Sequence, residues 1–304
     1  MSPQQMHRGI VVGVDGSAYS TVAVKWAARE AVMRDVPLRL VNVVSPDAAL
    51  AGPWPQTPLP SEFFQWQEDR ARQIIEDAHK NALEAASPTG TPQVDSELLY
   101  SPVVSTLVAL SKEADMVVVG RRGEGAVARA LLGSVSSHLV HHAHCPVAVI
   151  HDEDPLTTRP LQAPVVVGID GSPTSELATE IAFDEAALRG VGLVALHAWS
   201  DMGPLNFGKF GQAPIEWANF KVREEEVLAE RLAGWQDQFP DVDVHRIVVS
   251  DSPTPRLLEQ AETAQLLVVG SHGRGGFTGM LLGSVSGAVV NTAQIPVIVA
   301  RMPR

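Results

Sequence analysis

The sequence predicts an α/β protein of two similar domains in tandem, each built on a doubly wound, five-stranded parallel sheet. The first reason is a repeat, because residues 10–17 return almost unchanged as residues 165–172. The second is the alternation of short apolar runs with longer helical segments in both copies. The third is a glycine-rich pattern that follows the fourth apolar run of each copy at the same spacing.

In the first copy, an apolar strand at residues 10–14 leads into Asp15-Gly16-Ser17, and Ser17 is a suitable N-cap for a helix that reaches about residue 34. The remaining strands of this copy are expected at residues 38–44, 95–100, 116–119 and 147–150, and the remaining helices at residues 62–86, 103–113 and 135–143. Because strands alternate with helices, the crossovers are expected to be right-handed and the sheet parallel, with helices on both faces.

The second copy repeats this order after a linker. Residues 152–164 are polar and contain three prolines, which is typical of a linker, so the domains are expected at residues 1–151 and 165–304. The strands of the second copy are expected at residues 165–169, 193–199, 244–249, 266–269 and 297–300. Two segments rich in proline or glycine, residues 45–61 and 202–214, are expected to be loops.

The glycine-rich pattern is the part of the sequence with the clearest chemistry. It reads Gly120-x2-Gly123-x9-Gly133-Ser134 in the first copy and Gly270-x2-Gly273-x9-Gly283-Ser284 in the second. Glycines allow backbone N–H groups to approach an anion, and the helix that starts after the Gly-Ser step adds its positive dipole end. An ordinary strand-to-helix loop also uses glycines, but the pattern occurs twice at the same internal spacing, each time behind a strand, which favours a phosphate site.

Three features are expected to meet at one edge of each sheet, where ligands bind in open parallel sheets. They are the acid after the first strand, the exposed backbone at the end of the second strand, and the glycine loop after the fourth. This combination suits a nucleotide.

These motifs, Val14-Asp15-Gly16-Ser17 together with the duplicated Gly-x2-Gly-x9-Gly-Ser pattern, resemble the ATP-binding class of universal stress proteins. The resemblance covers nearly the whole chain and is to the tandem form common in actinobacteria. It implies the adenine nucleotide alpha hydrolase-like fold with strand order 3-2-1-4-5. It also implies ATP, about two molecules per chain, with Mg²⁺ carried in by the nucleotide.

The resemblance also implies roles for particular residues. Asp15 and Asp170 are expected beside the nucleoside, and the backbone of Val41 and Leu196 is expected to meet the adenine. The expected ribose and phosphate contacts are Gly120, Gly123, Gly133, Ser134, Val135 and Ser136 in the first copy, and Gly270, Gly273, Gly283, Ser284, Val285 and Ser286 in the second. The loops differ at Glu124 and its counterpart Arg274, which leaves the relative affinities of the two sites open.

Composition narrows the class of partner. A net charge of -12 argues against nucleic acid and anionic membranes. No apolar run approaches the roughly 20 residues that span a bilayer, and residues 1–8 contain no apolar signal core. The single cysteine, Cys145, excludes an internal disulfide. A cytoplasmic protein is therefore expected.

Several other motifs are weaker. Residues 123–128 match a dinucleotide fingerprint formally, but they lie inside the glycine loop and the second copy breaks the match at Thr278. Histidines beside Cys145 could hold a metal or could simply stabilise a helix C-terminus, and we expect no metal site. We expect five tryptophans to be packing or interface residues: Trp26, Trp66, Trp199, Trp217 and Trp235.

The sequence therefore predicts a regulatory ATP-binding protein, and the resemblance adds a role in stress response, dormancy or growth control. A regulatory protein partner is expected, and a homodimer is left open. No catalytic residue is assigned, because Glu124 and His272 do not recur at matching positions. Two alternatives are a slow ATPase or autophosphorylating enzyme, and a protein-interaction module that needs no nucleotide.

Overall fold

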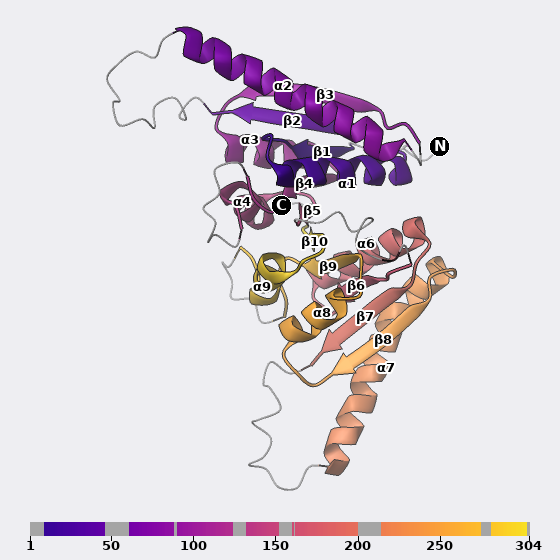
Figure 1. Cartoon of the computed structure of the whole chain (residues 1–304). Helices are drawn as coiled ribbons and strands as arrows, with labels where there is room; N and C mark the ends of the chain where they lie inside the picture. The colour runs from indigo at the N-terminus through magenta and orange to yellow at the C-terminus, as the bar shows by residue number, and fades with distance from the viewer. Residues whose placement is uncertain are drawn as a thin grey trace, which may run out of the picture. The chain divides into compact units, whose positions relative to one another are not determined.

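The computed structural model describes residues 9–45, 61–87, 90–123, 132–151, 160, 162–199, 214–274 and 281–302. Most of the expected linker and of the two expected loop segments lies outside these residues, as does Glu124. The chain forms two compact units that divide between residues 154 and 155 (Figure 1).

The first unit alternates strands and helices as the sequence predicts. In chain order its elements are β1 (Ile10–Gly13), α1 (Ala18–Arg34), β2 (Leu38–Val44), α2 (Ser61–Ala86), β3 (Val94–Tyr100), α3 (Val103–Leu110), the 3₁₀ turn η2 (Ser111–Glu113), β4 (Met116–Gly120), α4 (Ser134–His142) and β5 (Val147–Ile150). The strands pair in parallel in the order β3-β2-β1-β4-β5, which confirms the expected order.

The second unit has the same architecture. Its elements are β6 (Val165–Gly168), α6 (Pro173–Arg189), β7 (Leu193–Ala198), α7 (Pro214–Gln238), β8 (Val244–Val249), α8 (Pro253–Ala261), β9 (Leu266–Gly270), α9 (Ser284–Thr292) and β10 (Val297–Ala300). Its strands are again all parallel, in the order β8-β7-β6-β9-β10. Both units are therefore doubly wound α/β domains.

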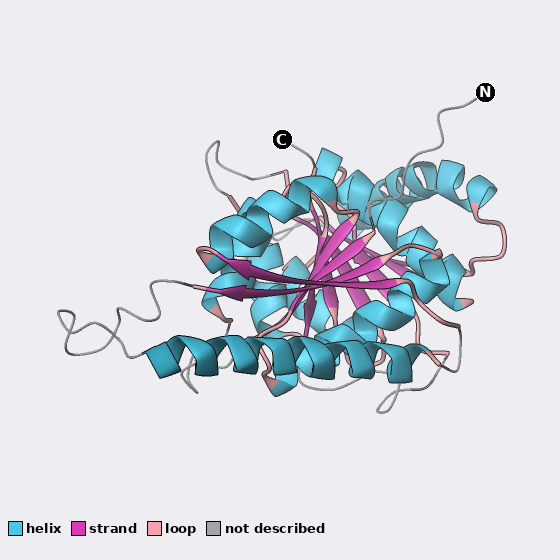
Figure 2. Ribbon diagram, turned by 90° about the horizontal axis from the view of Figure 1, so that it is seen from above, coloured by secondary structure: helices cyan, strands magenta, loops and turns pink. Residues whose placement is uncertain are grey.

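In each unit, helices cover both faces of the sheet, so the inner strands are buried on both sides (Figure 2). In the first unit α1 packs against α2, and α3 packs against α4. The inner strands β1 and β4 are short and rich in valine, which suits a strand buried on both faces. A parallel sheet of this kind exposes its strand ends as the natural place for a site.

The ends of α1 and α6 show how closely the two copies correspond. Ser17 caps α1 as predicted, because its side chain accepts from the N–H of Ser20, and Ser172 caps α6 in the same way through Ser175. At the other end the cap residue is left-handed in both helices. It is Asp35 in α1, at φ 52°, and Gly190 in α6, at φ 63°.

The structure shifts some element boundaries by a residue or a turn. The third helix stops at Leu110 and continues as a 3₁₀ turn. The fourth helix starts at Ser134, one residue earlier than expected, because Gly133 is extended (φ -68°, ψ 158°) and takes the N-cap position. Ser134 is therefore the first helical residue, and its N–H lies in the first turn.

Candidate functional site

The acid after the first strand of each unit holds the turn that follows it. Oδ1 of Asp15 accepts from the N–H of Ser17 at 3.0 Å. In the second unit Oδ1 of Asp170 accepts from both the N–H and the hydroxyl of Ser172, at 2.9 and 2.7 Å. One carboxylate oxygen of each acid is thus used in an Asx turn that sets the start of α1 or α6.

The other carboxylate oxygen reaches the glycine loop. A Cβ atom on Gly123 would lie 2.5 Å from Oδ2 of Asp15, and one on Gly273 would lie 2.5 Å from Oδ2 of Asp170. In the second unit that oxygen also accepts from the N–H of Arg274 at 3.0 Å. Each acid therefore joins the loop after the first strand to the loop after the fourth.

A second close approach occurs where the glycine loop leaves its strand. A Cβ atom on Gly120 would lie 2.7 Å from the backbone carbon of Tyr19, and one on Gly270 would lie 2.9 Å from that of Thr174. These distances are too short for any side chain. The first glycine of each motif is therefore required by packing against the first turn of α1 or α6.

The Gly-Ser-Val-Ser segment closes the loop and opens the next helix. The N–H of Gly133 donates to the carbonyl of Arg121 at 2.9 Å, and the hydroxyl of Ser136 donates to the same carbonyl at 2.9 Å. The first α4 backbone bond runs from Ser137 to Gly133, so the N–H groups of the preceding helical residues have no intrahelical acceptor. Donors at a helix start form an anion-binding position.

The second unit repeats this closure with one change of acceptor. The N–H of Gly283 donates to the carbonyl of Ser271 at 2.8 Å, while the hydroxyl of Ser286 donates to the carbonyl of Gly270 at 2.6 Å. In both units the second serine of the motif thus uses its hydroxyl proton inside the loop. The first serine, Ser134 or Ser284, lies at the helix start.

At the end of the second strand, the structure shows a pair of polar side chains that the sequence analysis missed. Nδ2 of Asn42 donates to the carbonyl of Val14 at 2.7 Å, and Nδ1 of His197 lies 2.6 Å from the carbonyl of Ile169. Both side chains are buried. The signal was a polar residue at the same position near the end of a mainly apolar strand in each copy.

His197 has a second partner that Asn42 lacks the length to match. Its Nε2 lies 3.1 Å from a carboxylate oxygen of Glu224 on α7. The carbonyl of Ile169 can only accept, so Nδ1 is the donor there, and the bond to Glu224 needs a proton on Nε2 or on the carboxyl group. The second site thus contains a strand-to-helix link through an imidazole.

The backbone carbonyl groups of the two residues expected to meet the adenine already accept hydrogen bonds from the neighbouring strand segment. The carbonyl of Val41 accepts from the N–H of Val14 at 2.9 Å, and the carbonyl of Leu196 accepts from the N–H of Ile169 at 2.8 Å. Both residues nevertheless line the cavity of their unit.

Each unit has a cavity at this edge of its sheet, of about 730 Å³ in the first and about 770 Å³ in the second. The first is lined by every residue that the sequence analysis assigned to that copy: Asp15, Val41, Gly120, Gly123, Gly133, Ser134, Val135 and Ser136. The second is likewise lined by Asp170, Leu196, Gly270, Gly273, Gly283, Ser284, Val285 and Ser286. The structure therefore brings together all the predicted site residues, in two separate groups.

The two cavities also contain residues that no sequence motif indicated. Trp66, Gln67 and Arg70 of α2 line the first, and Trp199 lines the second. Trp66 and Trp199 were expected to be packing or interface residues, and no pattern in the sequence indicated that they line the cavities. Trp26 and Trp235 do pack: Trp26 is buried, and Trp235 stacks on Phe183 with 6.2 Å between the ring centroids.

The first glycine loop supplies a cationic side chain to its own cavity. Arg122 lines the cavity, and its Nε is buried and finds no hydrogen-bond partner among the described residues. The corresponding residue of the second loop is His272, whose Nδ1 lies 3.1 Å from the hydroxyl of Ser271.

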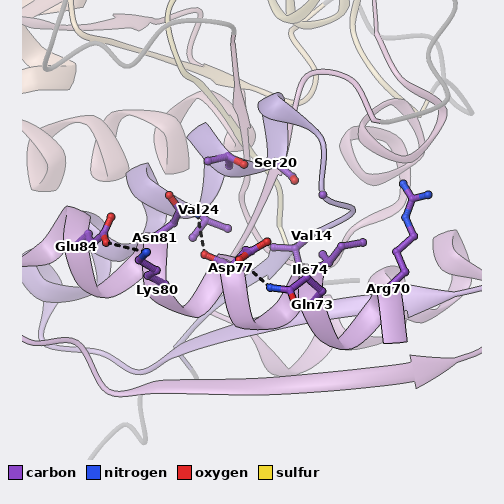
Figure 3. Close-up of a pocket in the computed structure, with 13 residues that line it drawn as sticks. Val14, Ser20, Val24, Arg70, Gln73, Ile74, Asp77, Lys80, Asn81 and Glu84 are labelled. Atoms are coloured by element: carbon purple, nitrogen blue, oxygen red, sulfur yellow. Dashed lines mark hydrogen bonds and ion pairs between the residues drawn. The ribbon is translucent and has the colours of Figure 1, made fainter. Parts of the chain in front are cut away.

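A third hollow, of about 380 Å³, lies between α1 and α2 (Figure 3). Its polar groups largely satisfy one another: Gln73 donates to the carboxylate of Asp77 at 3.1 Å, and Asn81 donates to the carbonyl of Asp77 at 2.7 Å. Arg70 stands at one end of this row and also lines the first cavity. The hollow therefore borders the first cavity and has no free set of ligand-binding groups of its own.

Two of the histidines near Cys145 lie close to backbone carbonyl groups of α4. Nδ1 of His138 lies 2.7 Å from the carbonyl of Ser134, and Nδ1 of His141 lies 2.5 Å from the carbonyl of Ser137. Within the described ranges, no three His, Cys, Asp or Glu residues are grouped so that they could hold a metal ion. The same ranges contain no helix with the length and apolar character needed to cross a bilayer.

Comparison with known proteins gives one consistent result. A model of the universal stress protein family matches residues 6–151 and 163–301. The chain is 59% identical over 317 residues to universal stress protein Rv1996 of Mycobacterium tuberculosis, covering 100% of this chain and 98% of the relative. It is 53% identical over 301 residues to universal stress protein Rv2005c of the same organism, covering 99% of both chains.

A solved structure extends the similarity to the fold. The crystal structure of a universal stress protein from Archaeoglobus fulgidus superimposes with a TM-score of 0.68 at 21% identity, covering 97% of this chain and 99% of the other.

Proposed function

The chain belongs to the universal stress protein family, and from that premise we propose that it is a regulatory ATP-binding protein with one nucleotide site in each unit. The sites are the cavities beside Asp15 and Asp170. The single observation that carries the proposal is the convergence of a glycine loop, a helix start and a carboxylate on one cavity, twice in one chain.

The glycine-loop end of each cavity suits the phosphates. The N–H groups at the starts of α4 and α9 point along the helix axis, and the positive end of each helix dipole adds to them. In the first cavity, the buried Nε of Arg122 supplies a charged donor. Guanidinium groups bind phosphate oxygens strongly, so this orphaned atom fits an anionic ligand.

The carboxylate suits the nucleoside and the metal that accompanies ATP. Asp15 and Asp170 are the acidic side chains that line the two cavities. A ribose hydroxyl can donate a hydrogen bond to a carboxylate oxygen. Mg²⁺ binds through a few carboxylates and the substrate phosphates, so we expect it to enter with ATP and to be held mainly by phosphate oxygens.

The proposal is binding rather than turnover. Both oxygens of Asp170 accept backbone N–H groups, from Ser172 and from Arg274, so this carboxylate acts as a tie between loops. The loop residues that could act as a general base, Glu124 and His272, do not recur at matching positions of the two copies. The proposed role is a cytoplasmic one in stress response, dormancy or growth control, in which nucleotide occupancy alters the contact with a regulatory protein partner or a second copy of the chain.

The test is mass analysis of the small molecules released when purified protein is denatured, followed by calorimetry of the stripped protein with Mg-ATP. We expect adenine nucleotide in the first experiment and close to two ATP per chain in the second. Protein that releases no nucleotide and gives no binding heat with ATP would rule out the proposal and favour an interaction module that needs no nucleotide.

A further inference from the structure

The two cavities are alike at the glycine loop and unlike at the opposite end. In each sheet the first strand lies between the second and the fourth. The end of β2 and the loop after β4 are therefore two strand spacings apart, about 10 Å. If the phosphates bind at the glycine loop, the base at the other end of the nucleotide lies near the end of β2 or β7.

At that far end of the first cavity lies an exposed aromatic ring from a helix. Trp66 is in the second turn of α2 and is 55% exposed, although it lines the cavity with Val43 and Val44. The guanidinium of Arg70, one turn later, lies 5.4 Å from the centre of the indole ring. The ring of Phe63 also lies 6.1 Å from the indole ring, between centroids, so Trp66 has two side-chain neighbours on its own helix.

At the same end of the second cavity, the aromatic ring comes from the strand side. Trp199 directly follows β7 and is half-buried, and its N–H donates to the carbonyl of Val249 at 3.2 Å. That bond fixes the backbone of Trp199 beside the end of β8. The two cavities thus each contain a tryptophan at the far end, supplied by different elements.

We propose that Trp66 and Trp199 are the residues on which the nucleobase stacks in the first and second site. This inference rests on the proposed nucleotide function and assigns the part of the site that no glycine motif describes. Aromatic rings stack on any base, because every base has a π-face. The rings therefore contribute affinity for the base, while the glycine loops contribute affinity for the phosphates.

The experiment compares Trp66→Leu and Trp199→Leu with wild type, using Mg-ATP and inorganic tripolyphosphate as separate probes. Each variant is expected to weaken ATP roughly 5- to 150-fold at one of the two sites, which is the range expected for a lost base stack. Tripolyphosphate has no base, so its binding is expected to stay unchanged. Trp66→Phe is expected to recover most of the ATP affinity.

The chain offers a matched control in Phe64→Leu. Phe64 is 51% exposed on the same helix and does not line either cavity, so its removal is expected to leave ATP binding unchanged. Equal ATP affinity in wild type and in both tryptophan variants would overturn the inference. So would an equal loss of ATP and tripolyphosphate, because that pattern indicates damage to the loop.

Tryptophan fluorescence separates failure of this inference from failure of the proposed function. We expect ATP to quench the tryptophan emission of the wild-type protein and tripolyphosphate to leave it unchanged. The quenching by ATP is expected to be smaller in each variant. If ATP binds by calorimetry without any change in emission, the stacking assignment is wrong while the nucleotide site stands. If neither probe binds wild type, the proposed function itself is wrong.

Discussion

Oδ2 of Asp15 occupies the space into which a side chain of Gly123 would project, 2.5 Å from the ideal Cβ position, and Asp170 stands in the same relation to Gly273. The carboxylate and the loop therefore fix one another's position. A side chain in place of either glycine would displace the carboxylate, which explains why the acid and the glycine recur together in both units.

The first prediction follows from this contact. Gly123→Ala and Gly273→Ala place a methyl group against a carboxylate oxygen, so each is expected to displace its loop and remove one binding event. Calorimetry should show the ATP stoichiometry fall from about two to about one in either variant.

Gly234→Ala is the control for those changes. Gly234 lies in α7 with nothing within 4 Å of an added Cβ, so alanine is expected to keep both binding events and to stabilise the helix by up to about 1 kcal/mol. A stoichiometry of two in Gly123→Ala, with unchanged affinity, would show that the first loop takes no part in binding.

The second prediction concerns the charge of the two acids. In the double variant Asp15→Asn, Asp170→Asn, the remaining carbonyl oxygen can still accept from the N–H of Ser17 or Ser172. At Asp170 the new amide group cannot accept from the N–H of Arg274, so we expect a melting temperature slightly below wild type without ligand. ATP affinity is expected to fall by about 1–3 kcal/mol per site, the scale of a hydrogen bond to a charged group.

Thermal melts with and without ATP test this, because a ligand that binds the native state raises the melting temperature by mass action. A double variant that melts normally and responds to ATP as strongly as wild type would identify the acids as turn residues only.

The extent to which the site was predictable depends on how local its signals are. Asp15, Gly123 and Ser134 belong to short motifs with fixed spacing, and the cavity brings them together as expected. Asn42 shows in the sequence only as a polar residue within an apolar strand. Trp66 belongs to no short motif. Its place beside the cavity depends on how α2 packs in the fold, and α2 is well separated from β2 in the sequence.

The third prediction tests the polar residue at the end of the second strand. Asn42→Leu and His197→Leu leave the buried carbonyls of Val14 and Ile169 without their side-chain donors. Each change is expected to lower the free energy of unfolding by about 1–3 kcal/mol. Urea titration of each variant measures the loss.

His197→Asn is the informative comparison, since asparagine fills this role in the first unit. It is expected to cost less than His197→Leu, because the donor to Ile169 remains while the contact with Glu224 is lost. Equal losses for the two variants would show that the link to α7 is the larger contribution.

The fourth prediction uses the matched helix ends. The C-cap residue of α1, Asp35, has a left-handed backbone conformation. The corresponding residue of α6 is Gly190, which has the same conformation. Asp35→Gly is expected to stabilise the protein by about 0.5–1 kcal/mol, and Gly190→Asp to destabilise it by a similar amount. An added Cβ on Gly190 meets nothing within 4 Å, so denaturant midpoints report the backbone conformation alone.

The close approach of Gly120 to Tyr19 has a consequence for motion. The glycine loop leaves β4 where the first turn of α1 begins, and no side chain separates the two backbones. A slow opening of the loop therefore carries the helix start with it, and amide hydrogen exchange should report the two segments as one cooperative unit. Ligand bound at the loop should then slow exchange at the start of α1, a segment that the glycine motif itself does not contain.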